Sequence, residues 1–253
     1  MKVWRVQNSP TGSVVSDGLG FDDSPDAEVI ALGFNRKQEY GAVGIGRHGN
    51  VLQWGYGDPP SQMTEAGRKL FLNCLHYIRR FDGRAPLVRV KAVHRLNSLR
   101  VAPVADQMRE RAEKDPKLIP LVPLDVLKKY AGNPDGLVTY YRDHMEYIYP
   151  DKGQLVVDGE LQALGLPSNR QPATLERLIA MLDDESHAAT VRKLLARYTE
   201  EPLGTRPQWQ QWFDRNKNRI YFTDVGGYKF EVVPEGYLTR PNNWTMAGAS
   251  SPR

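Results

Sequence analysis

The chain has 253 residues, of which 40% are hydrophobic and 25% are charged, a composition typical of folded globular proteins rather than disordered ones. Its mean hydropathy is −0.54, and no apolar run approaches the roughly 20 residues that a membrane-spanning helix needs, so no membrane partner is expected. The single cysteine, Cys74, excludes an intrachain disulfide and a cysteine-based zinc site.

The length fits one large domain or two modest ones. The first seven residues, Met1-Lys-Val-Trp-Arg-Val-Gln, lack the apolar segment of a signal peptide. A cytoplasmic location is therefore expected by default. A periplasmic or extracellular location is expected if the natural N-terminus lies upstream.

Residues 40–81 predict a strand, a turn, a second strand, a loop and a helix. Gly49-Asn50 lies between two apolar runs and tolerates positive φ, which favours a hairpin. Thr64 is a good N-cap, and Asp82-Gly83 ends the helix. Apolar residues at helical spacing predict a buried stripe that includes Cys74. Cys74 is therefore expected to be a small buried hydrophobe rather than a nucleophile.

The remaining elements follow from apolar periodicity and turn residues. Residues 84–104 are expected to form a connector and residues 239–253 a flexible tail. The other expected strands are residues 3–6, 28–33 (buried), and a second hairpin at 219–224 and 228–233, with a long loop at 8–26. The expected helices are residues 105–114, 124–131, 136–148, 173–182, 187–198 and 207–217.

Two segments carry a resemblance to a known family: Gly44-Ile-Gly-Arg-His-Gly-Asn-Val-Leu-Gln-Trp-Gly-Tyr and Met63-Thr-Glu-Ala-Gly-Arg-Lys-Leu-Phe-Leu-Asn-Cys-Leu-His-Tyr-Ile. Residues 28–83 resemble the closing section of the class I glutamine-amidotransferase-like fold, in its trehalose-utilisation-type branch. The resemblance implies a sheet with a packed helix. Those enzymes carry a nucleophilic Cys on a strand-to-helix turn, whereas Cys74 falls within a helix, so amidotransferase chemistry is not expected.

Later segments resemble bacterial proteins to which no activity is assigned, and this resemblance implies a shared architecture only. The segments that carry it are Leu194-Leu-Ala-Arg-Tyr-Thr, Trp209-Gln-Gln-Trp-Phe-Asp and Tyr221-Phe-Thr-Asp-Val-Gly-Gly-Tyr-Lys-Phe.

The turn at residues 47–50 is the first candidate binding site. Arg47, His48 and Asn50 place a permanent cation, a titratable imidazole and an amide on one turn, and Trp54 and Tyr56 follow on the exit strand. Cationic, amide and aromatic groups together suit a carboxylate or a sugar. In the alternative interpretation, Asn50 serves the turn geometry while Arg47 and His48 are exposed.

The loop before the first buried strand adds clustered carboxylates, of which Asp22 and Asp23 are the chosen candidates for ligand binding. Such clusters can bind a hard cation or act as general acid and base. Their spacing matches no EF-hand loop, so solvated loop acids are the alternative. The histidines form no zinc motif, and the glycines before Arg47 precede no helix, so neither a metal nor a cofactor is expected.

Charge is unevenly distributed. Residues 68–111 hold eleven Lys or Arg against three acids, a balance of +8, so the rest of the chain carries about −4 of the net +4. Such a block suits phosphate or nucleic acid. A solvated face is the alternative, and few aromatic residues are present there for base stacking, so a nucleic-acid partner is not expected.

Together these patterns predict an α+β protein. A small N-terminal sheet with one packed helix (residues 1–83) precedes a mainly helical segment closed by a hairpin (residues 105–238). We expect a non-catalytic binding or assembly module for a small molecule or carbohydrate, with self-association through open sheet edges as a further hypothesis. The alternatives are a carbohydrate-active, hydrolase-like enzyme with its site near His48 and the loop from Asp22 to Asp26, and phosphate or nucleic-acid binding through residues 68–111.

Overall fold

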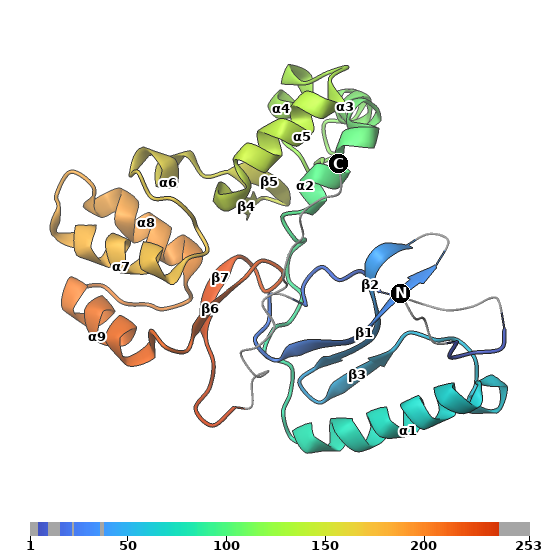
Figure 1. The fold of residues 1–253 in the computed structure, drawn as a ribbon. Helices are drawn as coiled ribbons and strands as arrows, with labels where there is room; N and C mark the ends of the chain where they lie inside the picture. The colour runs from blue at the N-terminus through green and yellow to red at the C-terminus, as the bar shows by residue number, and fades with distance from the viewer. Residues whose placement is uncertain (1–4, 10–15, 22, 36–37, 238–253) are drawn as a thin grey trace. The chain divides into compact units, whose positions relative to one another are not determined.

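The computed structural model describes residues 5–9, 16–21, 23–35 and 38–237. The chain divides into two compact units, one formed by Met1–Leu87 with Pro234–Arg253 and the other by Val88–Val233. Small antiparallel sheets and helices make up both (Figure 1), so the expected α+β class is confirmed. No helix in the described ranges is long and apolar enough to cross a membrane.

The first unit contains an antiparallel sheet in the order β1 (Ala27–Asn35), β2 (Gln38–His48), β3 (Val51–Trp54). The predicted hairpin is confirmed, with His48 paired to Val51 across the two-residue turn. Gly49 has a φ of +55°, as the first central residue of a tight hairpin turn requires.

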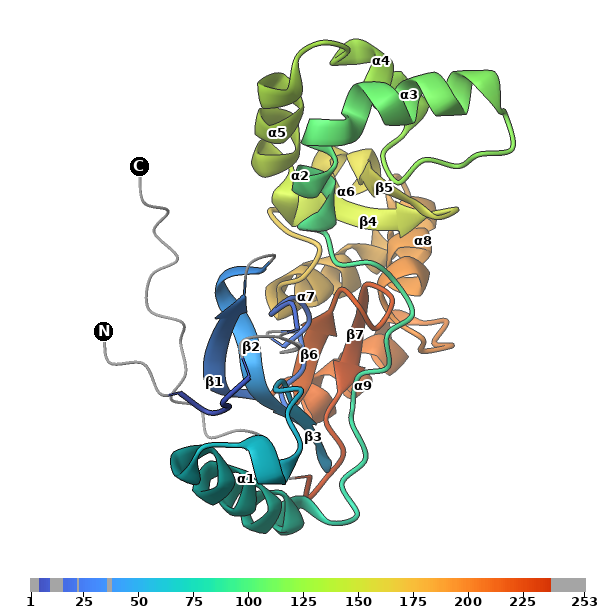
Figure 2. The same ribbon diagram turned by 90° about the vertical axis from the view of Figure 1, so that its right-hand side faces the viewer.

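Helix α1 (Glu65–Ile78) and a 3₁₀ turn (Arg79–Phe81) cover one face of this sheet (Figure 2). The Thr64 hydroxyl accepts a hydrogen bond from the Gly67 amide at 3.0 Å, so the predicted cap is confirmed. Cys74 is buried on the inner stripe, and burial raises the pKa of its thiol. A second 3₁₀ turn, Pro60–Gln62, precedes the helix.

Other expectations for this unit need correction. Strand β1 is an edge strand, and its Leu32 side chain is 57% exposed, so the expected burial of residues 28–33 is wrong. The strand expected at residues 3–6 lies partly outside the described residues. Residues 5 and 6 are described and are not in a strand, and the neighbouring Gln7 forms an isolated bridge with Met63. The tail expected at residues 239–253 lies entirely outside the described residues.

The second unit is mainly helical. Five predicted helices are confirmed as α3, α4, α7, α8 and α9, and the one expected at residues 136–148 is confirmed as α5 only as far as Asp143. Helices α2 and α6 were not predicted. The helices are α2 (Asn97–Arg100), α3 (Ala105–Lys114), α4 (Leu124–Lys129), α5 (Pro134–Asp143), α6 (Gly159–Ala163), α7 (Pro172–Ala180), α8 (Ala188–Tyr198) and α9 (Arg206–Asn216). Two 3₁₀ turns, Ala102–Val104 and Met181–Asp183, extend this framework.

Two hairpins complete the second unit. The predicted one consists of β6 (Ile220–Thr223) and β7 (Lys229–Val232). The other, β4 (Ile148–Asp151) with β5 (Gln154–Val157), was not predicted: Ile148 was assigned to the end of a helix, and no element was expected over residues 149–157. The helix ends instead at Asp143, and a 3₁₀ turn at Met145–Tyr147 leads into aromatic and β-branched residues that favour a strand.

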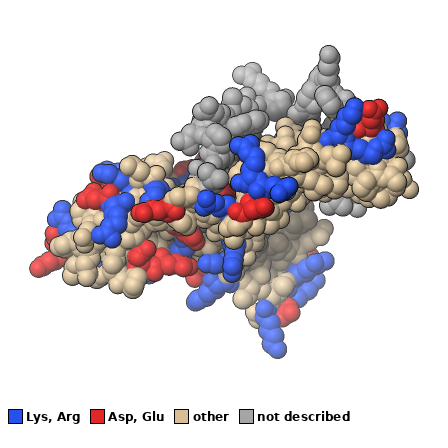
Figure 3. Space-filling view, turned by 90° about the horizontal axis from the view of Figure 1, so that it is seen from below, with Lys and Arg blue, Asp and Glu red and all other residues tan. Residues whose placement is uncertain are grey.

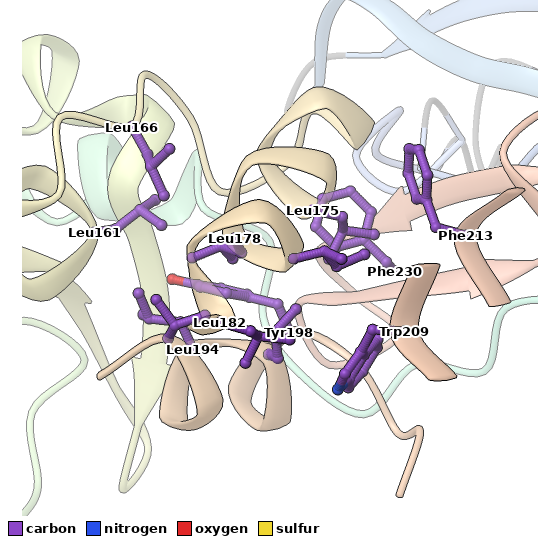
Figure 4. Packing of buried hydrophobic residues seen from close by; sticks show 13 residues of the cluster. Leu161, Leu166, Leu175, Leu178, Leu182, Leu194, Tyr198, Trp209, Phe213 and Phe230 are labelled. Carbon is purple, nitrogen blue, oxygen red and sulfur yellow. The ribbon is translucent and has the colours of Figure 1, made fainter. Parts of the chain in front are cut away.

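The core of this unit consists of two hydrophobic clusters. The first gathers side chains from α6 to α9 and β7, with Leu178, Leu194 and Tyr198 near its centre (Figure 4). The second includes Leu127, Tyr141 and other side chains around α4, α5 and β4. Tyr149 and Phe222 pack against both clusters, so the two form a continuous interior.

The segment expected to be a connector belongs largely to this second unit. The backbone amides of Lys91 and Ala92 both donate to the Val225 carbonyl, at 2.7 and 3.1 Å. Helix α2 and the turn after it then contribute Val101 and Ala102 to the second core cluster. Residues 88–104 therefore support the fold as well as linking its parts.

Candidate functional site

Arg47 is buried between the sheet and the end of α1. Its side chain is 1% exposed, its Nε donates to the Glu28 carboxylate at 3.1 Å, and one Nη donates to the Gly49 carbonyl at 3.0 Å. The guanidinium lies 3.7 Å from the centre of the Phe81 ring, and Tyr77 also donates to Glu28, at 2.5 Å. The alternative that Arg47 is exposed is wrong, and these contacts give it a structural role.

His48 lies beside a buried carboxylate from the loop before β1. Its Nε2 is 3.5 Å from Asp26 Oδ1, which is too long for a good hydrogen bond. The Asp26 side chain is fully buried and accepts hydrogen bonds from the Ser24 hydroxyl, the Leu87 amide (3.0 Å) and the Tyr237 hydroxyl (3.0 Å). Asp26 therefore ties together three segments of the first unit.

Burial lowers the pKa of His48; the nearby Arg47 lowers it further, whereas Asp26 raises it. The ring stacks on Phe21 with 6.3 Å between ring centres. Burial and the Asp26 carboxylate also raise the pKa of the neighbouring Tyr237 to about 12. Burial thus disfavours the protonated form of the imidazole, although a carboxylate lies beside it.

The predicted aromatic residues lie on the other face of the sheet. Trp54 pairs with Ile45, three residues from His48, so alternation along the strand puts Trp54 and His48 on opposite faces. Trp54 packs edge-on against Phe71 of α1 and against Tyr56, each with ring centres 5.1 Å apart. The sheet therefore separates the aromatic residues from the imidazole.

The remaining predicted residues have mixed outcomes. Asn50 is exposed, and its backbone N–H donates to the Arg84 carbonyl at 2.7 Å, which supports a role in the turn. Asp22 lies outside the described residues, and Asp23 lies in a turn of the same loop. The structure brings Asp26 of this loop to His48. The hydrolase alternative, which needs Asp22 as well, stays a prediction.

The basic block of residues 68–111 is divided between the two units, with its first part in Met1–Leu87 and the rest in Val88–Val233. One of its members, Arg95, is 1% exposed and therefore belongs to an interior rather than a solvated face. Phosphate or nucleic-acid binding through the block stays a prediction, and a gel shift at low salt tests it.

Arg95 forms a buried ion pair with Asp224, 129 residues away in sequence. Its Nε and one Nη each donate to the carboxylate at 2.6 Å, and its backbone amide donates there at 3.1 Å. The guanidinium also donates to the Met145 carbonyl (2.7 Å) and to Asn169 Oδ1 (3.2 Å). These hydrogen bonds join four stretches of the second unit, around residues 95, 145, 169 and 224.

A second buried carboxylate, Asp158, completes this polar interior. It caps α6 through the Leu161 amide at 3.0 Å and accepts from the Tyr198 hydroxyl and from Arg197, both at 2.5 Å. The Arg197 guanidinium lies 4.3 Å from the centre of the Tyr149 ring. These contacts also have a structural role.

An open groove in the second unit is a candidate site that sequence reasoning missed. It has a volume of about 640 Å³ and lies between α3, the loop before α4, the start of α4 and the β4–β5 turn. Its apolar lining includes Leu118 and Ile119, which are 42% and 61% exposed. The signal available in the sequence was Pro116-Lys-Leu-Ile-Pro-Leu-Val-Pro, an apolar run with no matching secondary structure.

The loop that carries these two side chains is held in place. Pro116, Pro120 and Pro123 fix φ along it. The Leu155 amide of β5 donates to the Leu121 carbonyl at 2.7 Å, and the Gln154 side chain donates to the Pro120 carbonyl at 3.1 Å. The apolar side chains of Leu118 and Ile119 therefore lie on a loop that prolines and hydrogen bonds hold in one conformation.

The charge available at the groove is positive. Glu113 is paired with Arg109 at 2.9 Å and with Lys128 at 3.7 Å. Lys152, at the tip of the β4–β5 turn, is exposed and has no partner among the residues that the structure describes. A ligand in the groove thus meets an apolar floor and an unpaired ammonium group.

A scan against protein-family models, a search of curated proteins and a search of solved structures each found no match to this chain. The resemblance to the amidotransferase-like fold therefore stays a prediction.

Proposed function

We propose that this protein is a non-catalytic binding module. Its binding site is the groove beside α3, and its ligand is a short segment of a partner protein that carries apolar side chains next to carboxylates. The observation that supports this most directly is the exposure of Leu118 and Ile119 on a braced loop at an open groove. Exposed apolar surface of this kind marks interaction sites on soluble proteins.

The lining favours such a peptide over a carbohydrate. A sugar site needs several polar groups that converge on the ligand. Among the described lining residues, Glu113 is already paired and Gln154 is bonded to the loop. Two apolar side chains and the ammonium group of Lys152 instead complement an apolar anchor with a neighbouring carboxylate.

Fluorescence anisotropy with labelled hexapeptides tests the proposal. The probe Glu-Glu-Leu-Phe-Glu-Glu is expected to bind saturably, whereas Lys-Lys-Leu-Phe-Lys-Lys and Glu-Glu-Ser-Ser-Glu-Glu are not. An Ile119→Ser substitution is expected to weaken binding by about tenfold, because it removes an apolar contact worth roughly 1.5 kcal/mol. A Lys152→Glu substitution is expected to weaken peptide binding as well, and to do so more strongly in low salt than in high salt.

Val90→Ser is the matched control, because Val90 is 80% exposed in the same unit and does not line the groove. It is expected to leave the affinity unchanged. Equal affinity for the acidic and basic peptides, or an Ile119→Ser protein that binds like the control, would contradict the proposal.

A further inference from the structure

The outer face of α1 exposes leucines although the helix already has a buried face. Leu72 and Leu75 are 56% and 44% exposed, whereas Cys74 and Phe81 pack inward. An ordinary surface helix keeps its outward face polar. Helix α1 therefore has a second, narrow apolar stripe.

The spacing of this stripe is that of a helix–helix seam. Arg68, Leu72, Leu75 and Arg79 are separated by four, three and four residues, so they follow the a and d positions of a heptad repeat. At 1.5 Å per residue, the two arginines lie roughly 16 Å apart along the helix axis. The seam is therefore apolar at its centre and cationic at both ends.

The flank of the seam carries hydrogen-bonding and charged side chains. Lys69 and His76 lie beside the leucines, and both are exposed. Lys69 is paired with Glu65 at 2.7 Å, whereas His76 and Arg79 have no partner among the described residues. Figure 3 looks onto the side of the molecule where α1 lies and shows separate groups of Lys and Arg with uncharged surface between them.

We infer that this face of α1 is a docking seam for an acidic amphipathic helix of a partner protein. The partner's leucine-type side chains would pack against Leu72 and Leu75, and its carboxylates would face Lys69, His76 and Arg79. Charged flanks of opposite sign are what select the partner in helix–helix pairing. This seam lies in the first unit and does not depend on the groove of the second unit.

The narrowness of the stripe favours a helix over other anionic partners. Helices that lie in a membrane surface bury a broad apolar face, and the broad apolar face of α1 is packed inside the first unit. Nucleic acid would gain no binding energy from the two leucines, because proteins bind its phosphate backbone through cationic side chains. Only a helix of matching pattern uses both the leucines and the cations.

The test uses a designed peptide of about 28 residues with Leu at positions a and d and Glu at positions e and g, long enough to form a helix. Isothermal titration calorimetry with the full chain is expected to show saturable binding that weakens as salt is added. A protein with both Leu72→Ser and Leu75→Ser is expected to lose about tenfold or more in affinity. A peptide of the same pattern with Lys in place of Glu is expected not to bind.

The control protein carries Ala66→Ser and Asn73→Ser, two exposed positions of α1 outside the seam. Circular dichroism checks that each variant keeps its helices. The inference is overturned if the double-leucine variant binds the acidic peptide as tightly as the control does, or if the peptide does not bind the unsubstituted protein. It is also overturned if vesicles of anionic lipid or a DNA duplex bind the seam and displace the peptide.

Discussion

Removing the charge of Asp224 is expected to destabilise the second unit strongly. The Arg95 and Asp224 side chains are 1% and 3% exposed, and two hydrogen bonds of 2.6 Å join them. An Asp224→Asn substitution keeps the shape of the side chain but leaves the guanidinium buried without its counter-ion. Such losses cost roughly 3–5 kcal/mol. The remaining acceptors, Met145 and Asn169, are neutral, so a loss of about 3 kcal/mol is expected.

Urea unfolding followed by circular dichroism at the helix band measures this loss, because most of the helices in the described residues lie in the second unit. Asp214→Asn is the matched control. Asp214 pairs with Lys217 at 3.7 Å on an exposed part of α9, and exposed pairs contribute less than about 1 kcal/mol. If Asp224→Asn lowers the free energy of unfolding no more than Asp214→Asn does, the interpretation that the buried ion pair of Arg95 stabilises the second unit through its charge is refuted.

A double variant tests the same reasoning in the opposite direction. Combining Arg95→Met with Asp224→Asn removes both charges of the ion pair, so that no unpaired cation is left buried. The double variant is expected to be more stable than Asp224→Asn alone by about 1 kcal/mol or more, because an unpaired buried charge is worse than an apolar side chain of similar length. A double variant that is less stable than the single one would contradict this account.

Three further predictions concern the first unit. Gly49→Ala is expected to lower stability by about 2 kcal/mol in thermal unfolding, because Gly49 has positive φ and an added Cβ would lie 2.5 Å from the Arg84 carbonyl; an unchanged melting temperature would contradict this. Nuclear magnetic resonance is expected to give His48 a pKa below 6.5. Since the unfolded chain then takes up its proton first, stability falls as pH drops from 6.5 towards the folded pKa, and His48→Gln removes that part of the pH dependence. Tyr237→Phe removes the hydroxyl that donates to Asp26 and is expected to lower the free energy of unfolding in urea by about 1 kcal/mol. An unchanged free energy of unfolding would show that this hydrogen bond does not stabilise the unit.

Local signals predicted much of the fold. Thr64 caps α1, Gly49 forms the hairpin turn, and the bounds expected for the helix at residues 105–114 are those observed for α3. Each of these elements is determined by residues that are close in sequence. Helix α6 could have been found in the same way, because Asp158 caps it through the Leu161 amide.

Features that depend on distant residues were not predictable. In the sequence, Arg95 is one more cation in a basic block, because no residue near it indicates that it pairs with Asp224. The β4–β5 hairpin was not predicted, since four-residue strands give little periodicity; the helix expected at residues 136–148 overlaps only its first residue.

The candidate site was only partly predictable for a related reason. Arg47 and His48 are neighbours in sequence, but consecutive strand residues point to opposite faces, so Arg47 lies against Phe81 while His48 faces Asp26. The groove depends on three segments meeting beside Leu118 and Ile119. Sequence shows that these two residues are apolar but not that they remain exposed.

The proposal that the groove is a peptide-binding site is tested most directly by ¹⁵N chemical-shift mapping of the full chain during titration with the Glu-Glu-Leu-Phe-Glu-Glu peptide. The account predicts that the amide signals that move are those around Leu118, Ile119, Lys128 and Lys152, which line the groove. No shifts at saturating peptide, or shifts that leave these residues unaffected, would contradict it.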